Sequence, residues 1–173
     1  MDVLMENEGK GMLYFPLFNY SDNSLHVLER LHQSTYTRMG LSDAGAHCGA
    51  VCDGGMPTFM LSHWTRDRTR GERLPLEWII SRQTSQTAEA YGFLDRGVLK
   101  EGYRADVNII NYDELSLGAP ELVWDLPAGG RRLIQRPSGY IATLCRGVVT
   151  AENGEPTGEL PGRLVRGRQS APR

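Results

Sequence analysis

The sequence lacks the features of a membrane-spanning protein, a disulfide-rich secreted protein and a nucleic-acid binder. No apolar run among its 173 residues approaches the ~20 residues that a bilayer span requires. Three cysteines are too few, and odd in number, for a disulfide framework. A net charge of -2 gives no general attraction to nucleic acid or anionic lipid. Because residues 1–10 also show no secretory signal, we expect a soluble, cytoplasmic protein with reduced thiols.

Lysine is also scarce, since Lys10 and Lys100 are the only two. The arginines gather late in the chain, where residues 129–173 hold 8 Arg against 3 Glu. Gly and Pro separate these arginines, which favours solvated turns and a frayed terminus over a nucleic-acid patch.

The first part of the sequence has an α/β pattern. Residues 11–18 (GMLYFPLF) predict a buried strand, residues 25–32 an amphipathic helix and residues 37–42 a second strand. Polar side chains at residues 22–24 can accept hydrogen bonds from the first N–H groups of the helix. Strand, helix and strand in this order predict a βαβ unit and a parallel sheet.

The second half of the chain changes character. Residues 48–73 are rich in Gly and then in charge, which predicts a long loop, and one helix is expected from Pro75 to Tyr91. Short strands follow between Gly and Pro residues and predict a small antiparallel sheet; they span residues 107–110, 141–145 and 148–151, with an Asn153-Gly154 turn. We therefore expect a boundary between residues 1–95 and residues 96–173.

Residues 40–47 (GLSDAGAH) are the most informative stretch for chemistry. Asp43 would lie at the carboxyl end of the second strand, where α/β folds place reactive groups, beside small residues that let a substrate or metal approach. A strand-ending turn is the structural alternative, and spacing alone favours it, because Ser-Asp-Ala-Gly is a common sequence at the end of a strand.

Residues 63–66 (HWTR) form a second candidate. They combine an imidazole, an aromatic plane and a guanidinium that can hold a carboxylate with two hydrogen bonds, although a solvated charged loop is the alternative. Cys48 and Cys52 lack the usual spacing of zinc ligands, so we expect small buried thiols there.

Taken together, the segments resemble the C-terminal portion of the N-acyl-D-amino-acid deacylase (D-aminoacylase) family of the amidohydrolase superfamily. The segment G-x-L-x-x-G-x-x-A-D at residues 97–106 is shared widely across the superfamily, whereas SDAGAH with SHW points to the deacylase branch. The resemblance covers most of the chain: FPLFNY (15–20), GLSDAGAH (40–47), PTFMLSHWTRDR (57–68), TAEAYG (87–92), DRGVLKEGYRADVNII (95–110), DLPAGGRRL (125–133) and NGEPTGELPGRLVRG (153–167).

The resemblance implies an α/β fold, namely the last two βα units of a metal-dependent TIM-type barrel over residues 1–95. Residues 96–173 would be part of a small β-rich domain. It also implies zinc as the cofactor, with Asp43 as a metal ligand and as the catalytic group that carries a proton from zinc-bound water to the departing nitrogen. His63 and Arg66 would bind the carboxylate or carbonyl of a small N-acyl amino acid.

One departure from that family is large. Its zinc ligands come mainly from earlier strands and include an H-x-H pair, which these 173 residues do not contain. A complete barrel also takes about 250 residues. We therefore expect a C-terminal fragment of a hydrolase acting on amide C–N bonds, inactive by itself. The alternative is a non-catalytic truncated or split half-protein that associates with an N-terminal chain or with itself.

Overall fold

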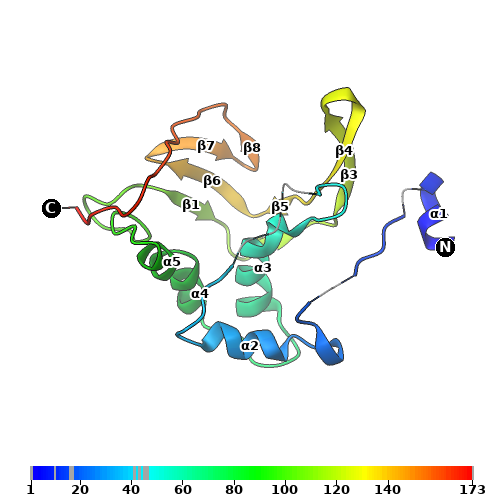
Figure 1. The fold of residues 1–173 in the computed structure, drawn as a ribbon, viewed down its shortest axis with the longest axis horizontal. Helices are drawn as coiled ribbons and strands as arrows, with labels where there is room; N and C mark the ends of the chain where they lie inside the picture. The colour runs from blue at the N-terminus through cyan, green and yellow to red at the C-terminus, as the bar shows by residue number, and fades with distance from the viewer. Residues whose placement is uncertain are drawn as a thin grey trace. The chain divides into compact units, whose positions relative to one another are not determined.

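The computed structural model describes residues 2–9, 11–15, 18–40, 42, 44 and 47–172 (Figure 1). The chain divides into two compact units, Met1–Arg38 and Met39–Arg173. Among the described residues, no helix is long and apolar enough to cross a membrane.

The first unit contains α1 (Asp2–Gly9), a 3-10 turn η1 (Ser21–Asn23) and α2 (His26–Gln33). α2 confirms the helix predicted over residues 25–32, and Ser24 Oγ accepts a hydrogen bond from the His26 N–H at 3.2 Å, as expected for a polar residue before a helix. No described residue of this unit is buried. The unit therefore has helices but no core of its own.

The two strands predicted for the βαβ unit are wrong wherever the structure describes them. Residues 11–15 and 18 belong to no strand, and neither do residues 37–40 and 42. An extended segment becomes a strand only when a neighbour pairs with its N–H and C=O groups, and the described residues supply no such neighbour. The parallel sheet of the predicted TIM-type barrel is therefore not seen in the described part of the chain.

The second unit begins with helices where a long loop was predicted. That loop prediction is wrong because Met60, Leu61 and Trp64 lie at helical spacing and are all at most 5 % exposed. The helix expected over residues 75–91 is confirmed but breaks at Thr84, which has φ -121° and ψ -93°. The helical elements are η2 (Asp53–Gly55), α3 (Met56–Ser62), the π-helical turn η3 (His63–Asp67), α4 (Leu76–Gln83) and α5 (Ser85–Ala90).

The strands of the second unit follow its helices, and the sheets found among the described residues are antiparallel. β1 (Val107–Ile110), β6 (Tyr140–Cys145), β7 (Val148–Glu152) and β8 (Glu155–Pro156) form one sheet in the order β1-β6-β7-β8. Two small sheets pair β2 (Ser116–Leu117) with β5 (Pro137–Ser138), and β3 (Glu121–Leu126) with β4 (Gly130–Ile134), the latter two joined by η4 (Pro127–Gly129). The predicted strands near residues 107, 141 and 148 are thus confirmed.

The turn residues explain why the larger sheet folds back so tightly. β6 and β7 are joined by Arg146 and Gly147, with φ of 55° and 79°, and β7 and β8 by Asn153 and Gly154, with φ of 50° and 84°. Two successive residues with positive φ make the turn that suits the twist of a two-residue hairpin. The Asn-Gly turn predicted from the sequence is therefore confirmed.

The core of the second unit lies where α3 packs against α4 and β2. Its buried apolar side chains are Met60, Leu61, Trp64, Leu74, Ile79 and Leu115.

The basic tail is more ordered than its sequence suggests. Gln169 N–H donates to the Gly92 carbonyl at 2.9 Å, and Leu94 N–H donates to the Gln169 carbonyl at 3.0 Å. The frayed terminus expected from composition is therefore wrong at this point. The domain boundary predicted at residue 95 is a separate matter. The elements do change from helix to strand near it, between α5 and β1. The division into two compact units, however, falls after Arg38, so a boundary at residue 95 stays a prediction.

Candidate functional site

The segment that carries His63 and Arg66 is a helix that changes its winding. α3 leads into the π-helical turn η3, in which the Arg68 N–H donates to the His63 carbonyl at 2.9 Å. Trp64, at 0 % exposed, anchors the turn in the core. Such turns are frequent at functional sites. η3 therefore fixes where the side chains of the second predicted site lie.

His63 packs against two aromatic rings. Its ring stacks on Phe59, with 4.6 Å between centroids, and meets the edge of Trp64 at 5.6 Å. Burial lowers the pKa of His63, the nearby Arg68 guanidinium lowers it further, and Asp67 partly opposes both. The imidazole is therefore neutral near pH 7, with one ring nitrogen able to donate a hydrogen bond and the other able to accept one.

Arg66 has every donor of its guanidinium occupied. Nε and Nη2 donate to the two carboxylate oxygens of Asp67 at 2.6 and 2.9 Å. The other donors reach backbone carbonyls: that of Tyr112, that of Asp113 at 3.1 Å and that of Leu115 at 2.6 Å. A guanidinium has five N–H groups, and these bonds use all five. Arg66 therefore clamps η3 to residues 112–115, and its substrate-binding role stays a prediction.

Hydroxyl groups extend the same connection between α3 and the strands. Thr65 Oγ1 and the Tyr112 hydroxyl are 2.5 Å apart, and Thr58 Oγ1 and the Tyr140 hydroxyl are 2.8 Å apart. These partners lie 47 and 82 residues apart in the sequence. The α3–η3 segment is thus held from both ends by side chains of the β-rich part.

Arg68 is a buried arginine that the sequence pattern did not single out. It is 3 % exposed, its guanidinium lies 4.2 Å from the centre of the Trp64 ring, and its Nε donates to the Arg70 carbonyl at 2.8 Å. Gly71 has φ of 99°, and a Cβ there would overlap the Arg68 guanidinium. The spacing W-x-x-x-R was the available signal, because it places a ring and a cation on one side of a helical turn.

Asp43, the predicted catalytic residue and metal ligand, lies outside the described residues, so its role stays a prediction. Parts of the chain near it are described. Ala44 passes close to Gly54, where a Cβ would be 3.5 Å from the Ala44 Cβ. The Cys48 carbonyl accepts a hydrogen bond from the Leu133 N–H at 2.6 Å. Ala44 thus lies beside η2, and Cys48 is hydrogen-bonded to β4.

The described residues do not fit a zinc ion. Among them, no group of three or more His, Cys, Asp or Glu side chains is placed to hold a metal. Cys48, Cys52 and Cys145 are free thiols, and burial, with a further contribution from Asp53, raises the pKa of Cys52. Because zinc binds the thiolate, this shift disfavours ligation by Cys52. Asp43 by itself supplies one carboxylate, whereas a catalytic zinc needs three protein ligands.

Comparison with known proteins identifies the family. The model of the amidohydrolase family matches residues 28–151, a range that includes position 43 as well as His63 and Arg66. Searches of the curated proteins and of the solved structures found no match. Since the family match covers well over half of the sequence, the chain belongs to the amidohydrolase family and has a hydrolase-type function.

Proposed function

We propose that this chain is the C-terminal portion of a zinc-dependent amidohydrolase that hydrolyses the amide bond of N-acyl-D-amino acids or related small amides. The observation that carries the proposal is the family match over residues 28–151, which includes the segments GLSDAGAH and SHWTRDR. The three free thiols accord with a cytoplasmic location for the enzyme.

In this proposal Asp43 is the proton carrier. Its carboxylate takes a proton from the attacking water and returns it to the departing amide nitrogen, so that one group acts first as a base and then as an acid. Because the described residues do not form a metal site, the zinc ligands other than Asp43 would come from outside this chain. We therefore propose that the 173-residue chain is inactive by itself.

His63 is the better supported of the two proposed substrate-binding residues. Its neutral imidazole can donate a hydrogen bond to the carbonyl or carboxylate of an N-acyl amino acid without first giving up an ion pair. Arg66 would have to release one of its five hydrogen bonds to reach the same groups. In this proposal Arg66 supports the site mainly by holding η3 in place. It would contact the substrate only after releasing one of these hydrogen bonds.

The test is a variant at position 43 in the assembled enzyme. The chain is produced together with the polypeptide encoded directly upstream of it, and hydrolysis of N-acetyl-D-amino acids is compared with that of their L-enantiomers. We expect turnover of the D-substrates, and a fall in kcat of about 10³-fold for Asp43→Asn, within the range for loss of a general acid–base group. Asp53→Asn, which changes an exposed aspartate on η2, is the matched control. Full activity in Asp43→Asn would contradict the proposal.

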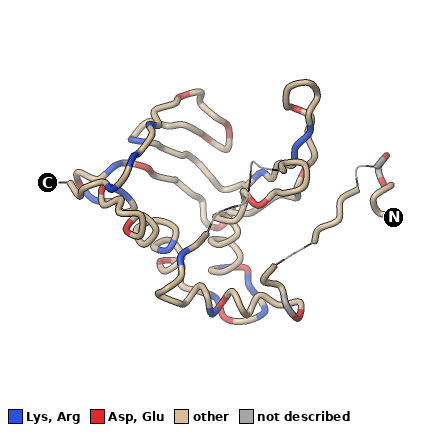
Figure 2. The backbone as a smooth tube through the Cα atoms, viewed as in Figure 1, with Lys and Arg blue, Asp and Glu red and all other residues tan. Residues whose placement is uncertain are grey.

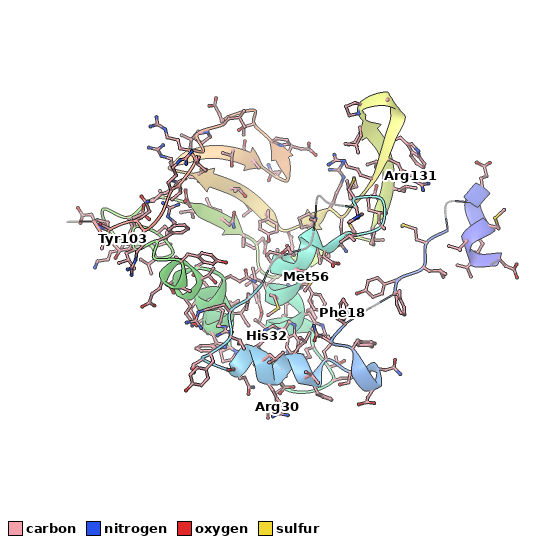
Figure 3. The ribbon with its side chains drawn as sticks, viewed as in Figure 1. Phe18, Arg30, His32, Met56, Tyr103 and Arg131 are labelled. Atoms are coloured by element: carbon pink, nitrogen blue, oxygen red, sulfur yellow. The ribbon has the colours of Figure 1, made fainter. Side chains whose placement is uncertain are left out.

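A second candidate function, association without catalysis, is favoured by the apolar residues of the first unit. Tyr14 is 86 % exposed and Phe15 77 %, and Phe18, labelled in Figure 3, is 78 % exposed. Exposed apolar patches of this kind are typical of interaction surfaces. We propose that they bind an N-terminal half of the enzyme or a second copy of the chain. Light scattering that shows a monomer at high micromolar concentration would contradict self-association.

A further inference from the structure

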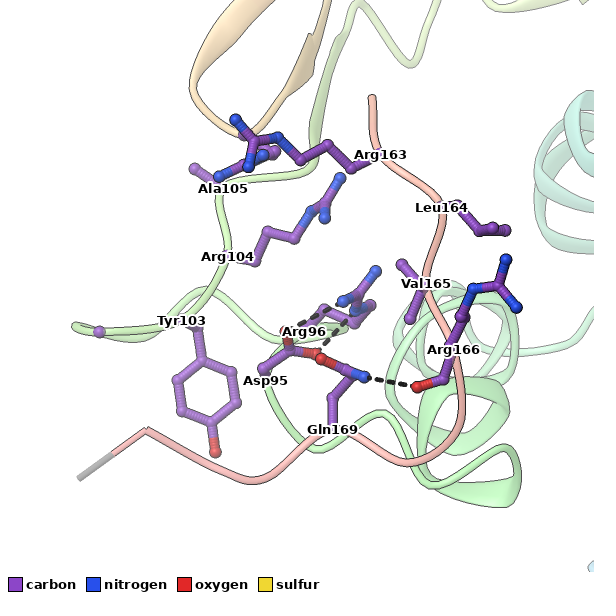
Figure 4. Close-up of a pocket in the computed structure, with 12 residues that line it drawn as sticks. Asp95, Arg96, Tyr103, Arg104, Ala105, Arg163, Leu164, Val165, Arg166 and Gln169 are labelled. Atoms are coloured by element: carbon purple, nitrogen blue, oxygen red, sulfur yellow. Dashed lines mark hydrogen bonds and ion pairs between the residues drawn. The ribbon is translucent and has the colours of Figure 1, made fainter. Parts of the chain in front are cut away.

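A pocket on the second unit lies apart from the residues discussed so far. Residues 95–105, between α5 and β1, form one wall and residues 163–169 of the tail form the other (Figure 4). The Gln169 hydrogen bonds to Gly92 and Leu94 hold the two walls together. The pocket has a volume of about 620 Å³, which is within the range of small-molecule sites.

The lining is dominated by arginine. Figure 2 shows basic positions, in blue, along the tail and along the facing loop. Five guanidinium groups stand against two carboxylates, Asp95 in the lining and Asp106 directly beside it, so the formal charge is +3. The five arginines are Arg96, Arg104, Arg146, Arg163 and Arg166. In a chain whose net charge is -2, this is a local concentration of positive charge.

The two carboxylates are already committed within the cluster. Asp95 pairs with Arg96 through two hydrogen bonds of 2.7 and 2.9 Å. Asp106 accepts hydrogen bonds from Arg104 Nε at 2.8 Å and from the Arg146 backbone N–H at 2.9 Å. Burial alone would raise the pKa of Asp106, but these bonds outweigh it and leave the pKa below its usual value. Both carboxylates thus position the arginines without neutralising all of them.

Donors remain available on several of these arginines. Arg104 uses Nε for Asp106 and Nη2 for the Cys145 Sγ at 3.4 Å, so Nη1 has no acceptor among the described residues. The side chains of Arg146 and Arg163 make no hydrogen bond or ion pair within the described chain. Figure 4 shows the Arg163 side chain reaching from the tail across to Ala105. Arg66, by contrast, has no donor to spare.

From this arrangement we infer that the pocket binds a small oxyanion carrying two or more negative charges, with Arg104, Arg146 and Arg163 as its donors. Guanidinium groups bind phosphate and carboxylate oxygens through paired charge-assisted hydrogen bonds. A charge of +3 is matched by a phosphorylated or polycarboxylated small molecule and not by a single carboxylate. The site is independent of the proposed hydrolysis, since none of its residues belongs to that candidate site.

The experiment titrates the 173-residue chain with pyrophosphate, citrate and acetate by calorimetry at low ionic strength. We expect saturable 1:1 binding of pyrophosphate or citrate and none of acetate. Stronger binding of pyrophosphate assigns a phosphorylated ligand, whereas stronger binding of citrate assigns a polycarboxylate. Arg163→Ala should weaken binding by about tenfold, the loss expected for one charge-assisted hydrogen-bonded pair.

The matched control is Arg131→Ala, which removes the same charge from an exposed arginine on β4, labelled in Figure 3. Binding by this variant should equal that of the parent chain. Two results would overturn the inference: no saturable binding of either multivalent anion, or the same weakening in Arg131→Ala as in Arg163→Ala. The second result would show attraction to overall charge and no defined site.

Discussion

The two compact units of the chain differ in what they do with their apolar residues. The second unit buries Trp64, Ile79 and Leu115 completely, at 0 % exposed each. The first unit leaves Tyr14, Phe15 and Phe18 more than three-quarters exposed. Burial of apolar surface is the main source of folding free energy. We therefore conclude that the stability of the described fold comes from the second unit, and association through the first unit stays a proposal.

The largest expected effect is a loss of core packing in the second unit. Trp64→Ala should lower the free energy of unfolding by about 3–5 kcal/mol, as for other buried large-to-small changes. Phe18→Ala in the first unit should change it by less than about 0.5 kcal/mol, as for exposed positions. Urea unfolding followed by circular dichroism measures both. Similar losses of unfolding free energy for the two variants would contradict the conclusion that the stability comes from the second unit.

The second prediction concerns the Arg66 clamp. Arg66→Ala should destabilise the second unit by about 2–3 kcal/mol, because it leaves three backbone carbonyls and Asp67 without their donor. Arg66→Lys should recover only part of this loss, since an ammonium cannot reproduce the planar fork. Thermal unfolding measures the difference, with Arg131→Ala as the control. Full recovery by lysine would show that charge alone matters at this position.

The third prediction tests the backbone at Gly71. Gly71→Ala should cost about 1–2 kcal/mol, because its positive φ strains an L-residue and the new Cβ meets the Arg68 guanidinium. Gly162→Ala is the control, since nothing lies within 4 Å of a Cβ there and its φ is not positive. Equal midpoints of unfolding for the two variants would show that the Arg68–Trp64 contact does not depend on this glycine.

The smallest expected effect is on the pH dependence of stability. The pKa of His63 is lower in the folded chain than its ordinary value of 6.5. The unfolded chain therefore binds a proton first as pH falls, so stability declines from about pH 6.5 down to the folded pKa. The aspartates whose pKa values are lowered affect the pH dependence of stability only below their ordinary pKa of 3.8. His63→Gln should remove this decline, so that stability changes less as the pH falls below about 6.5.

Local sequence patterns correctly predicted the elements whose formation depends only on neighbouring residues. The amphipathic pattern of residues 25–32 predicted α2, and the Asn153-Gly154 turn predicted the β7–β8 hairpin, because both depend on neighbours within a few residues. The same reasoning was wrong for residues 11–15. Their apolar character predicts burial, but a strand also needs a partner, and no property of the segment itself supplies one.

The site was predictable only in part for the same reason. The residue types at His63 and Arg66 were recognisable, yet three of the hydrogen bonds of Arg66 go to carbonyls 46 to 49 residues further along the chain. Every residue has a backbone carbonyl, so the sequence does not indicate which carbonyls accept hydrogen bonds from Arg66. An arginine that holds two segments together therefore could not be distinguished from one that binds a ligand. The Gly-rich start and Arg-rich end of residues 48–73 likewise concealed the helical spacing of Met60, Leu61 and Trp64.

The central proposal is that Asp43 is one component of a hydrolytic centre and that the other metal ligands lie outside this chain. The most direct measurement is hydrolysis of an N-acetyl-D-amino acid by the purified 173-residue chain with zinc added. We predict no turnover above buffer, because the described residues offer no set of three ligands. Measurable, zinc-dependent turnover that is lost in Asp43→Asn would contradict this claim, since it would mean that these residues suffice to build the centre.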